Sequence, residues 1–159
     1  EGEWQNDERC GVGICSFANG DVYEGEFAGG AQDGEGICTY KNGDVYTGMW
    51  ACGKRNGEGE CKYGDFDPAS GMRSYYRGGW KDDYRSGVGT MIAADGDRYD
   101  GLWVCDQRQG RGVQRYCGKG DRYVGSFFKD KRHGHGTHTY SNGNKVRDSR
   151  RFSPASHVV

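Results

Sequence analysis

A five-residue pattern, Tyr-x-Gly-x-(Trp/Phe), recurs along this chain of 159 residues at an almost constant interval. Five complete copies begin at Tyr23, Tyr46, Tyr76, Tyr99 and Tyr123, and a sixth, Gly2-Glu3-Trp4, lacks the tyrosine. The steps between successive tyrosines are 23, 30, 23 and 24 residues. Repetition with this period indicates an architecture in which each unit packs against its neighbours. It favours a scaffold or interaction module over an enzyme.

Composition allows only a thin core, and that core must be aromatic. Hydrophobic residues make up 33% of the chain and the mean hydropathy is −0.98, values that are typical of chains that cannot bury a large core. The chain nevertheless holds 11 Tyr, 6 Phe and 4 Trp, most of them in register with the repeat. Because each aromatic side chain buries a large area, a few per repeat can stabilise a fold.

Residues within each repeat alternate with period two, which predicts β-strands. In the second repeat, one face carries alternate residues from Tyr23 to Phe27 and from Gly34 to Tyr40, and the other face carries Glu24, Glu26, Glu35, Ile37 and Thr39. Glycines thus share a face with the rings. A missing side chain opposite a ring leaves a slot for it, which explains glycine inside a strand.

The connectors predict a meander. Asn-Gly or Asp-Gly pairs lie between repeats, at Asn19-Gly20, Asn42-Gly43, Asp95-Gly96 and Asn142-Gly143, and predict tight hairpin turns. The connector inside a repeat, such as Ala51–Asn56, is predicted to be longer. Every strand is then antiparallel to its neighbour. The predicted fold is all-β: an elongated, twisted, antiparallel meander of six hairpin repeats in a single-layer open sheet.

Each aromatic pattern is followed by Gly-x-Gly, a short strand and a tight turn, and the best copies are Tyr46–Gly59 and Tyr123–Tyr140. Six such units in register resemble MORN repeats (membrane occupation and recognition nexus), over residues 1 to about 145. The resemblance implies an elongated antiparallel sheet. It also implies roles like those of flagellar radial-spoke components, parasite cytoskeletal organisers and myosin-binding adaptors.

The repeats are predicted at residues 1–22, 23–45, 46–75, 76–98, 99–122 and 123–145, followed by a basic tail at 146–159. The third repeat contains an insertion, 64–75, that predicts a protruding loop. Phe66 and Met72 are candidate contact residues in this loop, although a surface insertion is also tolerated without any function. Because the chain begins inside a repeat and without Met, we interpret it as a fragment of a longer protein.

Charge is uneven along the chain. Residues 1–64 hold 12 acidic and 5 basic residues, a net charge of −7, whereas residues 65–159 hold 11 acidic and 17 basic residues, a net charge of +6. A rod with ends of opposite sign attracts an acidic partner at its basic end or stacks head to tail. The alternative is that both ends are simply solvated and screened by salt.

The cysteines predict packing positions. Cys15, Cys38 and Cys61 are each 23 residues apart, and Met91, Gln114 and His138 take this position in the later repeats. Equivalent residues of adjacent repeats lie about two strand spacings, roughly 9.6 Å, apart. That separation exceeds the limit of about 7 Å for a disulfide. We therefore expect reduced thiols in a cytosolic protein, with a disulfide ladder or a cysteine-rich metal site as the alternatives.

No catalytic, cofactor-binding or metal-binding residues are predicted, and the chain is not expected to be an enzyme. His133, His135 and His138 resemble a zinc cluster in sequence, but strand alternation points His135 and His138 to opposite faces. Gly118-Lys119-Gly120 lacks the spacing of a phosphate-binding loop.

The predicted function is a protein-interaction scaffold in the cytoplasm, of the cytoskeleton or of a ciliary or flagellar axoneme. Its partners would be other proteins, reached through the aromatic face, by end-to-end contact or by edge-strand pairing, and no nucleic acid is expected. The candidate partner-binding residues are Tyr76, Trp80, Tyr99, Trp103, Tyr123 and Phe127 on the aromatic face, Phe66 and Met72 in the insertion, and Lys145, Arg147, Arg150 and Arg151 in the tail.

Two other functions remain open. Basic residues between Lys129 and Arg151 would attract an anionic or phosphoinositide-containing membrane, at about 1 kcal/mol each. This would make the chain a membrane-tethering module. The resemblance also implies that the array can be an accessory domain of an enzyme lying outside this chain, such as a lipid kinase or a SET-type methyltransferase.

Overall fold

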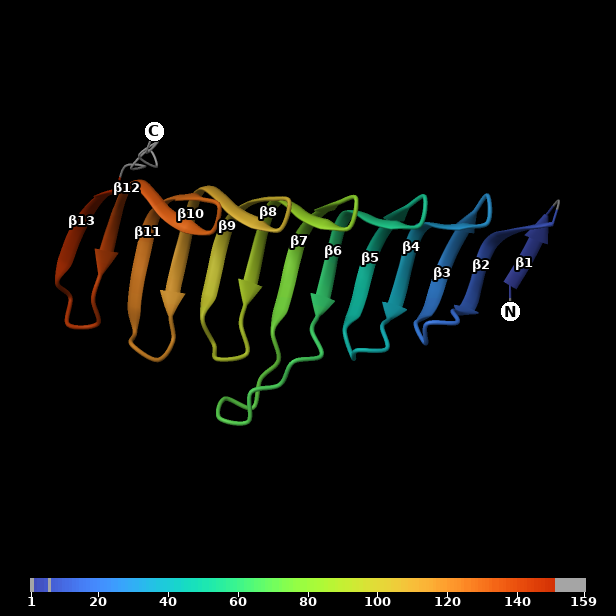
Figure 1. The fold of residues 1–159 in the computed structure, drawn as a ribbon, viewed down its shortest axis with the longest axis horizontal. Helices are drawn as coiled ribbons and strands as arrows, with labels where there is room; N and C mark the ends of the chain where they lie inside the picture. The colour runs from blue at the N-terminus through green and yellow to red at the C-terminus, as the bar shows by residue number, and fades with distance from the viewer. Residues whose placement is uncertain (1, 6, 151–159) are drawn as a thin grey trace, which may run out of the picture.

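A computed structural model of the chain describes residues 2–5 and 7–150, which form one antiparallel sheet of thirteen strands (Figure 1). The strands lie across the sheet in chain order, so each pairs with the next in the sequence. Their bounds are β1 Gly2–Gln5, β2 Glu8–Ser16, β3 Val22–Ala28, β4 Ala31–Thr39, β5 Val45–Ala51, β6 Lys54–Lys62, β7 Tyr75–Lys81, β8 Tyr84–Ile92, β9 Arg98–Val104, β10 Gln107–Tyr116, β11 Asp121–Phe128, β12 Lys131–Thr139 and β13 Lys145–Arg150.

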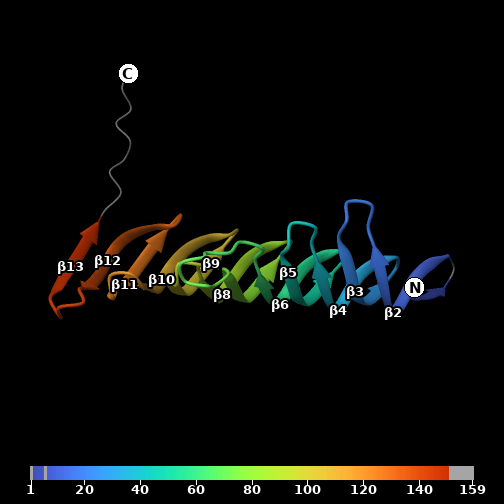
Figure 2. The same cartoon turned by 90° about the horizontal axis from the view of Figure 1, so that it is seen from below.

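The predicted fold class is confirmed. Seen from below, the described residues form a ribbon with no second layer on either face (Figure 2). Within the described residues, no helix is long and apolar enough to cross a membrane.

The lengths of the two kinds of turn are the reverse of the prediction. Turns inside repeats are the shorter ones: Cys52 and Gly53 alone join β5 to β6, with φ of 49° and 78°, as a type I′ hairpin requires. Between repeats, the Phe17 carbonyl accepts a 2.9 Å hydrogen bond from the Gly20 N–H, and Gly20 alone of this turn takes a positive φ, 95°. The prediction was wrong because Cys, Asp and Lys at the type I′ positions carry no Asn-Gly signal.

The two glycines of each Gly-x-Gly have different roles. In the second repeat, Gly34 has a φ of 96° where the register of β3 against β4 shifts between Gly25 and Phe27. Gly34 therefore supplies the backbone conformation of a β-bulge. Gly36 pairs with Gly25 across the strands, and a Cβ at Gly36 would lie 2.5 Å from Cε2 of Tyr23. The predicted slot for the ring is thus made by the second glycine.

The core is one continuous ladder of aromatic rings on one face of the sheet, called the ring face here. Tyr23 contacts Phe27 of its own strand and Trp50 of the next repeat, with centroids 5.0 and 5.2 Å apart and planes at 82°. The same edge-to-face contacts continue through every repeat to Tyr123 and Phe127, at 5.0 to 5.5 Å. Such contacts add about 0.5–1.5 kcal/mol per pair beyond area burial.

The polar atoms of the ladder are all bonded to backbone. The Tyr23 hydroxyl donates to the Glu26 carbonyl at 2.8 Å, and the other four repeat tyrosines donate to the equivalent carbonyl. The Trp50 Nε1–H donates to the Gly36 carbonyl at 3.3 Å. Since the tyrosine bonds a carbonyl within the bulge, each ring fixes both the packing and the irregular backbone beside it.

Cysteines at the predicted packing position lie on the ring face. Cys15, Cys38 and Cys61 are buried against the rings and form no disulfide. Burial raises the pKa of the Cys61 thiol to about 11.

The sheet continues beyond residue 145, where a tail was predicted. Lys145–Arg150 form a thirteenth strand that pairs with β12, from Thr139 opposite Lys145 to Gly134 opposite Arg150. Lys145, Arg147 and Arg150 therefore belong to an edge strand, and Arg151 lies outside the described residues.

We expect Gly36→Ala to lower the free energy of unfolding by about 1–3 kcal/mol, because the new methyl group would force the Tyr23 ring out of its slot. Urea denaturation measures the change. Gly118→Ala is the matched control, since no atom lies within 4 Å of the position its Cβ would take and its φ is not positive. Equal effects of the two substitutions would contradict the assignment of Gly36.

We expect the protein to unfold at high pH. Burial raises the pKa of Tyr23 from 10.0 to about 12 and that of Cys61 from 9.0 to about 11. Both groups ionise at lower pH in the unfolded chain than in the folded one. Their stabilising contribution is therefore complete below about pH 9 and is lost as the pH rises from 9 to 12.

Urea titrations across this range measure the effect as the free energy of unfolding at each pH. Tyr23→Phe should reduce the decrease above pH 10, and Tyr84→Phe, which changes an exposed ring, should not. A free energy of unfolding that stays level up to pH 12 would contradict the expectation.

Candidate interaction surfaces

The rings predicted to contact a partner are buried. Their exposed fractions are 0–4%, for Tyr76, Trp80, Tyr99, Trp103, Tyr123 and Phe127. They are core residues, so a partner on the ring face would contact the side chains that cover them. Period-two alternation shows which face a residue lies on, but it does not show whether the residue is buried or exposed on that face. The buried rings were therefore not distinguished from the side chains that cover them.

Arginines cover the rings. Arg55, Arg85 and Arg108 occupy the same place in three successive repeats, and Cζ of Arg55 lies 4.3 Å from the ring centroid of Trp80 in the next repeat. Arg85 takes the same position over Trp103, at 4.4 Å. Each guanidinium thus adds a cation–π contact between adjacent repeats.

Each of these arginines is also hydrogen-bonded to an aspartate in the short turn of the following repeat. The Arg85 N–H and Nε both donate to Asp106 Oδ1 at 2.9 Å, and Nη2 donates to the Asp106 carbonyl at 3.1 Å. The pairs Arg55–Asp83 and Arg108–Asp130 repeat this arrangement. The charges of these three arginines are therefore paired within the chain.

A row of rings, called the aromatic row, lies at the end of the strands where the turns between repeats are. It consists of the half-buried Phe17, Tyr40, Tyr63 and Tyr116 and the exposed Tyr140. Each lies at the end of the second strand of its repeat, and Ala93 takes this place in the fourth. A depression of about 390 Å³ extends from Phe17 and Tyr40 to Asp83, and another of about 360 Å³ extends from Asp97 to Asp130. Each depression is lined by residues of the turns inside repeats and by residues of the turns between repeats. The ring face is therefore a trough.

Aspartates also connect the turns beside the aromatic row. Asp21 Oδ1 accepts from the Lys41 N–H at 2.9 Å, and Asp97 Oδ1 accepts from the Cys117 N–H at the same distance. At the insertion, Ser74 takes the place of this aspartate, and its Oγ accepts from the Ala94 N–H at 3.0 Å. Asp65 holds Ser74 by accepting its N–H at 2.9 Å. The insertion therefore leaves the row of connections intact.

The insertion projects from the ribbon between β6 and β7 (Figure 1). Asp67 pairs with Met72, and the Asp67 carboxylate accepts the N–H groups of Ala69 and Ser70. Phe66 is 56% exposed and Met72 is 40% exposed. Both predicted contact residues therefore lie at the surface of an ordered loop, and their role in binding stays a prediction.

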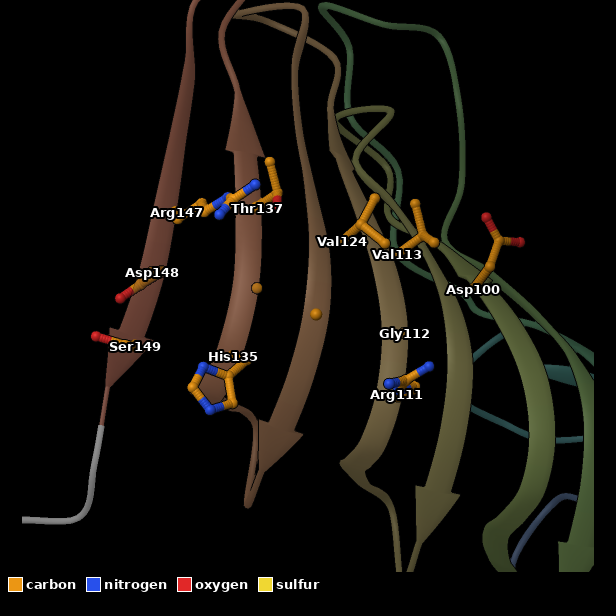
Figure 3. Close-up of a pocket in the computed structure, with 12 residues that line it drawn as sticks. Asp100, Arg111, Gly112, Val113, Val124, His135, Thr137, Arg147, Asp148 and Ser149 are labelled. Carbon is orange, nitrogen blue, oxygen red and sulfur yellow. The ribbon is translucent and has the colours of Figure 1, made fainter.

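The face opposite the rings, called the opposite face, carries a depression of about 760 Å³ over β9–β13 (Figure 3). Val113 and Val124 lie side by side in its floor as a cross-strand pair. Arg111, His135 and Arg147 surround them. Of the predicted tail residues, Arg147 therefore lines a depression, and Lys145 lies in the same edge strand.

The three histidines diverge. His138 lies on the ring face between Arg132 Nη1 and Asp121 Oδ2, at 2.9 and 3.2 Å. His135 lies in the depression on the opposite face, and His133 contacts the Phe128 ring. Within residues 2–5 and 7–150, no three His, Cys, Asp or Glu residues are placed to hold a metal ion.

The arginines over the ladder are the residues that sequence reasoning missed. Their signal was available: Arg9, Arg55, Arg85, Arg108 and Arg132 each stand two residues before the first glycine of Gly-x-Gly. The aspartate partners follow 28, 21 and 22 residues later for Arg55, Arg85 and Arg108. Recognising them required the knowledge that adjacent repeats bring these positions together.

We expect Arg85→Ala to lower the free energy of unfolding by about 2 kcal/mol, because it removes charge-assisted hydrogen bonds and a cation–π contact. Arg85→Lys should not restore stability, since an ammonium cannot bond Asp106 through the same fork. Chemical denaturation measures both. Arg122→Ala, on the opposite face, serves as a control that should change stability by less than about 0.5 kcal/mol.

Comparison with known proteins agrees with this geometry. The MORN repeat family matches six segments, residues 1–22, 23–45, 46–67, 76–98, 99–120 and 123–145. No curated protein matches the chain. A solved structure, the SAS-4 (dCPAP) TCP domain in complex with a Proline Rich Motif of Ana2 (dSTIL) of Drosophila melanogaster, matches with a TM-score of 0.50 and 11% identity, over 88% of this chain and 73% of that one.

The likeness to the TCP domain is one of fold. The repeats indicate a protein-interaction or membrane-associated module. With six repeats matched over nearly its whole length, the chain belongs to the MORN-repeat family.

Proposed function

We propose that this chain is a non-catalytic scaffold that binds an extended, proline-rich segment of a partner protein along the aromatic row. The observation that carries the proposal is the spacing of that row. Phe17, Tyr40 and Tyr63 occupy equivalent positions in successive repeats, about two strand spacings or roughly 9.6 Å apart. A polyproline II helix advances about 9.3 Å in one turn of three residues.

One proline in three would therefore meet one ring per repeat. Aromatic-lined grooves recognise proline-rich segments in this way, because the preformed helix loses little entropy on binding. Half-buried rings suit the purpose, since they are already held in place. The complex of the SAS-4 TCP domain with a Proline Rich Motif gives a precedent for such a partner on a sheet of similar fold.

The proposal extends to the setting. A long ribbon with repeated contact points suits a structural component of the cytoskeleton, and we propose a cytoplasmic, cytoskeletal location on this ground. We propose a ciliary or axonemal location on the family resemblance alone.

Membrane association is the second candidate function, and exposed Arg98, Arg115 and Arg122 on the opposite face favour it. Flotation with liposomes that contain phosphoinositide tests this possibility, and absence of binding at low salt would remove it. An enzyme domain outside this chain remains a third proposal, which the full open reading frame would test.

We expect a labelled peptide with proline at every third position to bind the protein, as measured by fluorescence anisotropy. Tyr63→Ala combined with Tyr116→Ala should weaken binding at least about tenfold, or 1.4 kcal/mol, because two stacking surfaces are lost. Tyr84→Ala, which removes an exposed ring from the other row of turns, should leave the affinity unchanged.

A second peptide of the same composition with irregular proline spacing provides a control. Equal binding of both peptides would contradict the spacing argument. Circular dichroism of each variant separates a lost contact from a lost fold.

A further inference from the structure

Charge on the opposite face is segregated along the ribbon. From β3 to β6 this face carries five glutamates and two lysines, a net charge of −3: Glu24, Glu26, Glu35, Glu58, Glu60, Lys54 and Lys62. From β9 to β13 it carries five arginines, two lysines and one aspartate, a net charge of +6: Arg98, Arg111, Arg115, Arg122, Arg147, Lys131, Lys145 and Asp100. On the ring face, Arg55, Arg85 and Arg108 are paired with aspartates, whereas the opposite face carries charge that is separated by sign along the ribbon.

The basic part holds more positive charge than the chain neutralises. Arg115 lies directly across from Arg98 on one side and Arg122 on the other, so three arginines form one cross-strand row. Like charges placed opposite one another destabilise a sheet. The Asp100 carboxylate reduces this repulsion, because its Oδ1 lies 2.7 Å from Arg98 Nη2 and its Oδ2 pairs with Arg115 Nη1. Arg122 and Arg111 have no carboxylate partner among the described residues.

Apolar side chains lie between the charges. Exposed examples on this face include Val12, Ile14, Val22, Ile37, Met49, Val88, Leu102 and Val124. Val88 is 71% exposed near the middle of the ribbon. An exposed apolar surface rimmed by charge is typical of a protein-binding face.

We propose that the opposite face binds a second copy of this chain, with the two ribbons antiparallel and face to face. A two-fold axis through the middle of the face would place the acidic part of each copy over the basic part of the other. The contact would be isologous, because the same surface serves both copies. Two twisted sheets pack face to face with their strands about 30° apart, which brings the apolar side chains of one copy against those of the other.

The face is large enough. Thirteen strands about 4.8 Å apart, each near 20 Å long, give a footprint of about 1,200 Å². A specific interface needs about 800 Å² from each partner, so contact over two thirds of the face is sufficient. This inference is independent of the proposed function, which uses the ring face.

Charge reversal tests the proposal. One variant carries Glu24→Lys, Glu26→Lys and Glu35→Lys, which makes the whole face basic. The other carries Arg111→Glu, Arg122→Glu and Arg147→Glu, which makes it mainly acidic. Light scattering with size exclusion should find the unchanged chain dimeric at about 50 mM salt and dissociating at about 500 mM salt. Each variant alone should dimerise at least about tenfold more weakly.

Mixing the two variants is the decisive step, because a basic face and an acidic face then meet. Native mass spectrometry should detect the heterodimer, which also shows that both variants fold. A control with Lys41→Glu, Lys119→Glu and Lys129→Glu, all exposed in turns, lowers the net charge by as much as the arginine reversal does. It should dimerise as the unchanged chain does.

Three results would overturn the proposal. One is that the unchanged chain is monomeric at low salt, whether or not it binds an acidic peptide. Another is a dimer that survives both reversals, as edge pairing through β1 or β13 would. The third is a mixture that stays monomeric although circular dichroism shows both variants folded. Proline-peptide binding should be the same in both variants, so failure here leaves the ring-face function intact.

Discussion

The contact of each repeat tyrosine with a pair of glycines is the constraint on which the fold depends. A single-layer sheet has no second layer to bury its side chains, so a large ring must be covered by its own neighbours. Removing the side chains at Gly25 and Gly36 lets the Tyr23 ring lie against the backbone. Its edges then meet Phe27 and Trp50, and its exposed fraction falls to 0%. Five copies of this contact, at Tyr23, Tyr46, Tyr76, Tyr99 and Tyr123, replace the second layer that other sheets need.

Contacts between adjacent repeats make the ribbon a chain of nearest-neighbour interfaces. A tryptophan contacts the tyrosine of the preceding repeat, and an arginine donates hydrogen bonds to an aspartate of the following repeat. Aspartates in the turns between repeats accept backbone N–H groups from the next such turn. Stability then accumulates with each interface. Ser74 shows how strong this requirement is, because it restores one such bond where the insertion has displaced the aspartate.

Alternation and repetition were sufficient to predict the strands, their order, the aromatic face and the buried cysteine position, because all of these depend on period-two geometry within one unit. Features that depend on how units meet were not predictable in this way. Arg55 looks like an exposed cation until Trp80 and Asp83 of the next repeat lie against it. The type I′ turn at Cys52-Gly53 has no sequence signal, since its φ values are imposed by the strands on each side. β13 was missed because Lys145–Arg150 has no aromatic pattern, although its backbone pairs with β12 all the same.

The two faces are under different constraints, and this bears on where function lies. On the ring face, a new side chain must fit the space above the glycines, keep the contact with the neighbouring ring and keep the hydrogen bond to the backbone. On the opposite face, the residue between the two glycines of Gly-x-Gly is Glu35, Glu58, Val88, Arg111 or His135 in five successive repeats. A position that accepts such different side chains is not specified by packing. The ordering of these residues by sign along the ribbon, acidic first and basic last, therefore needs a cause outside the fold, and a complementary charged surface is such a cause.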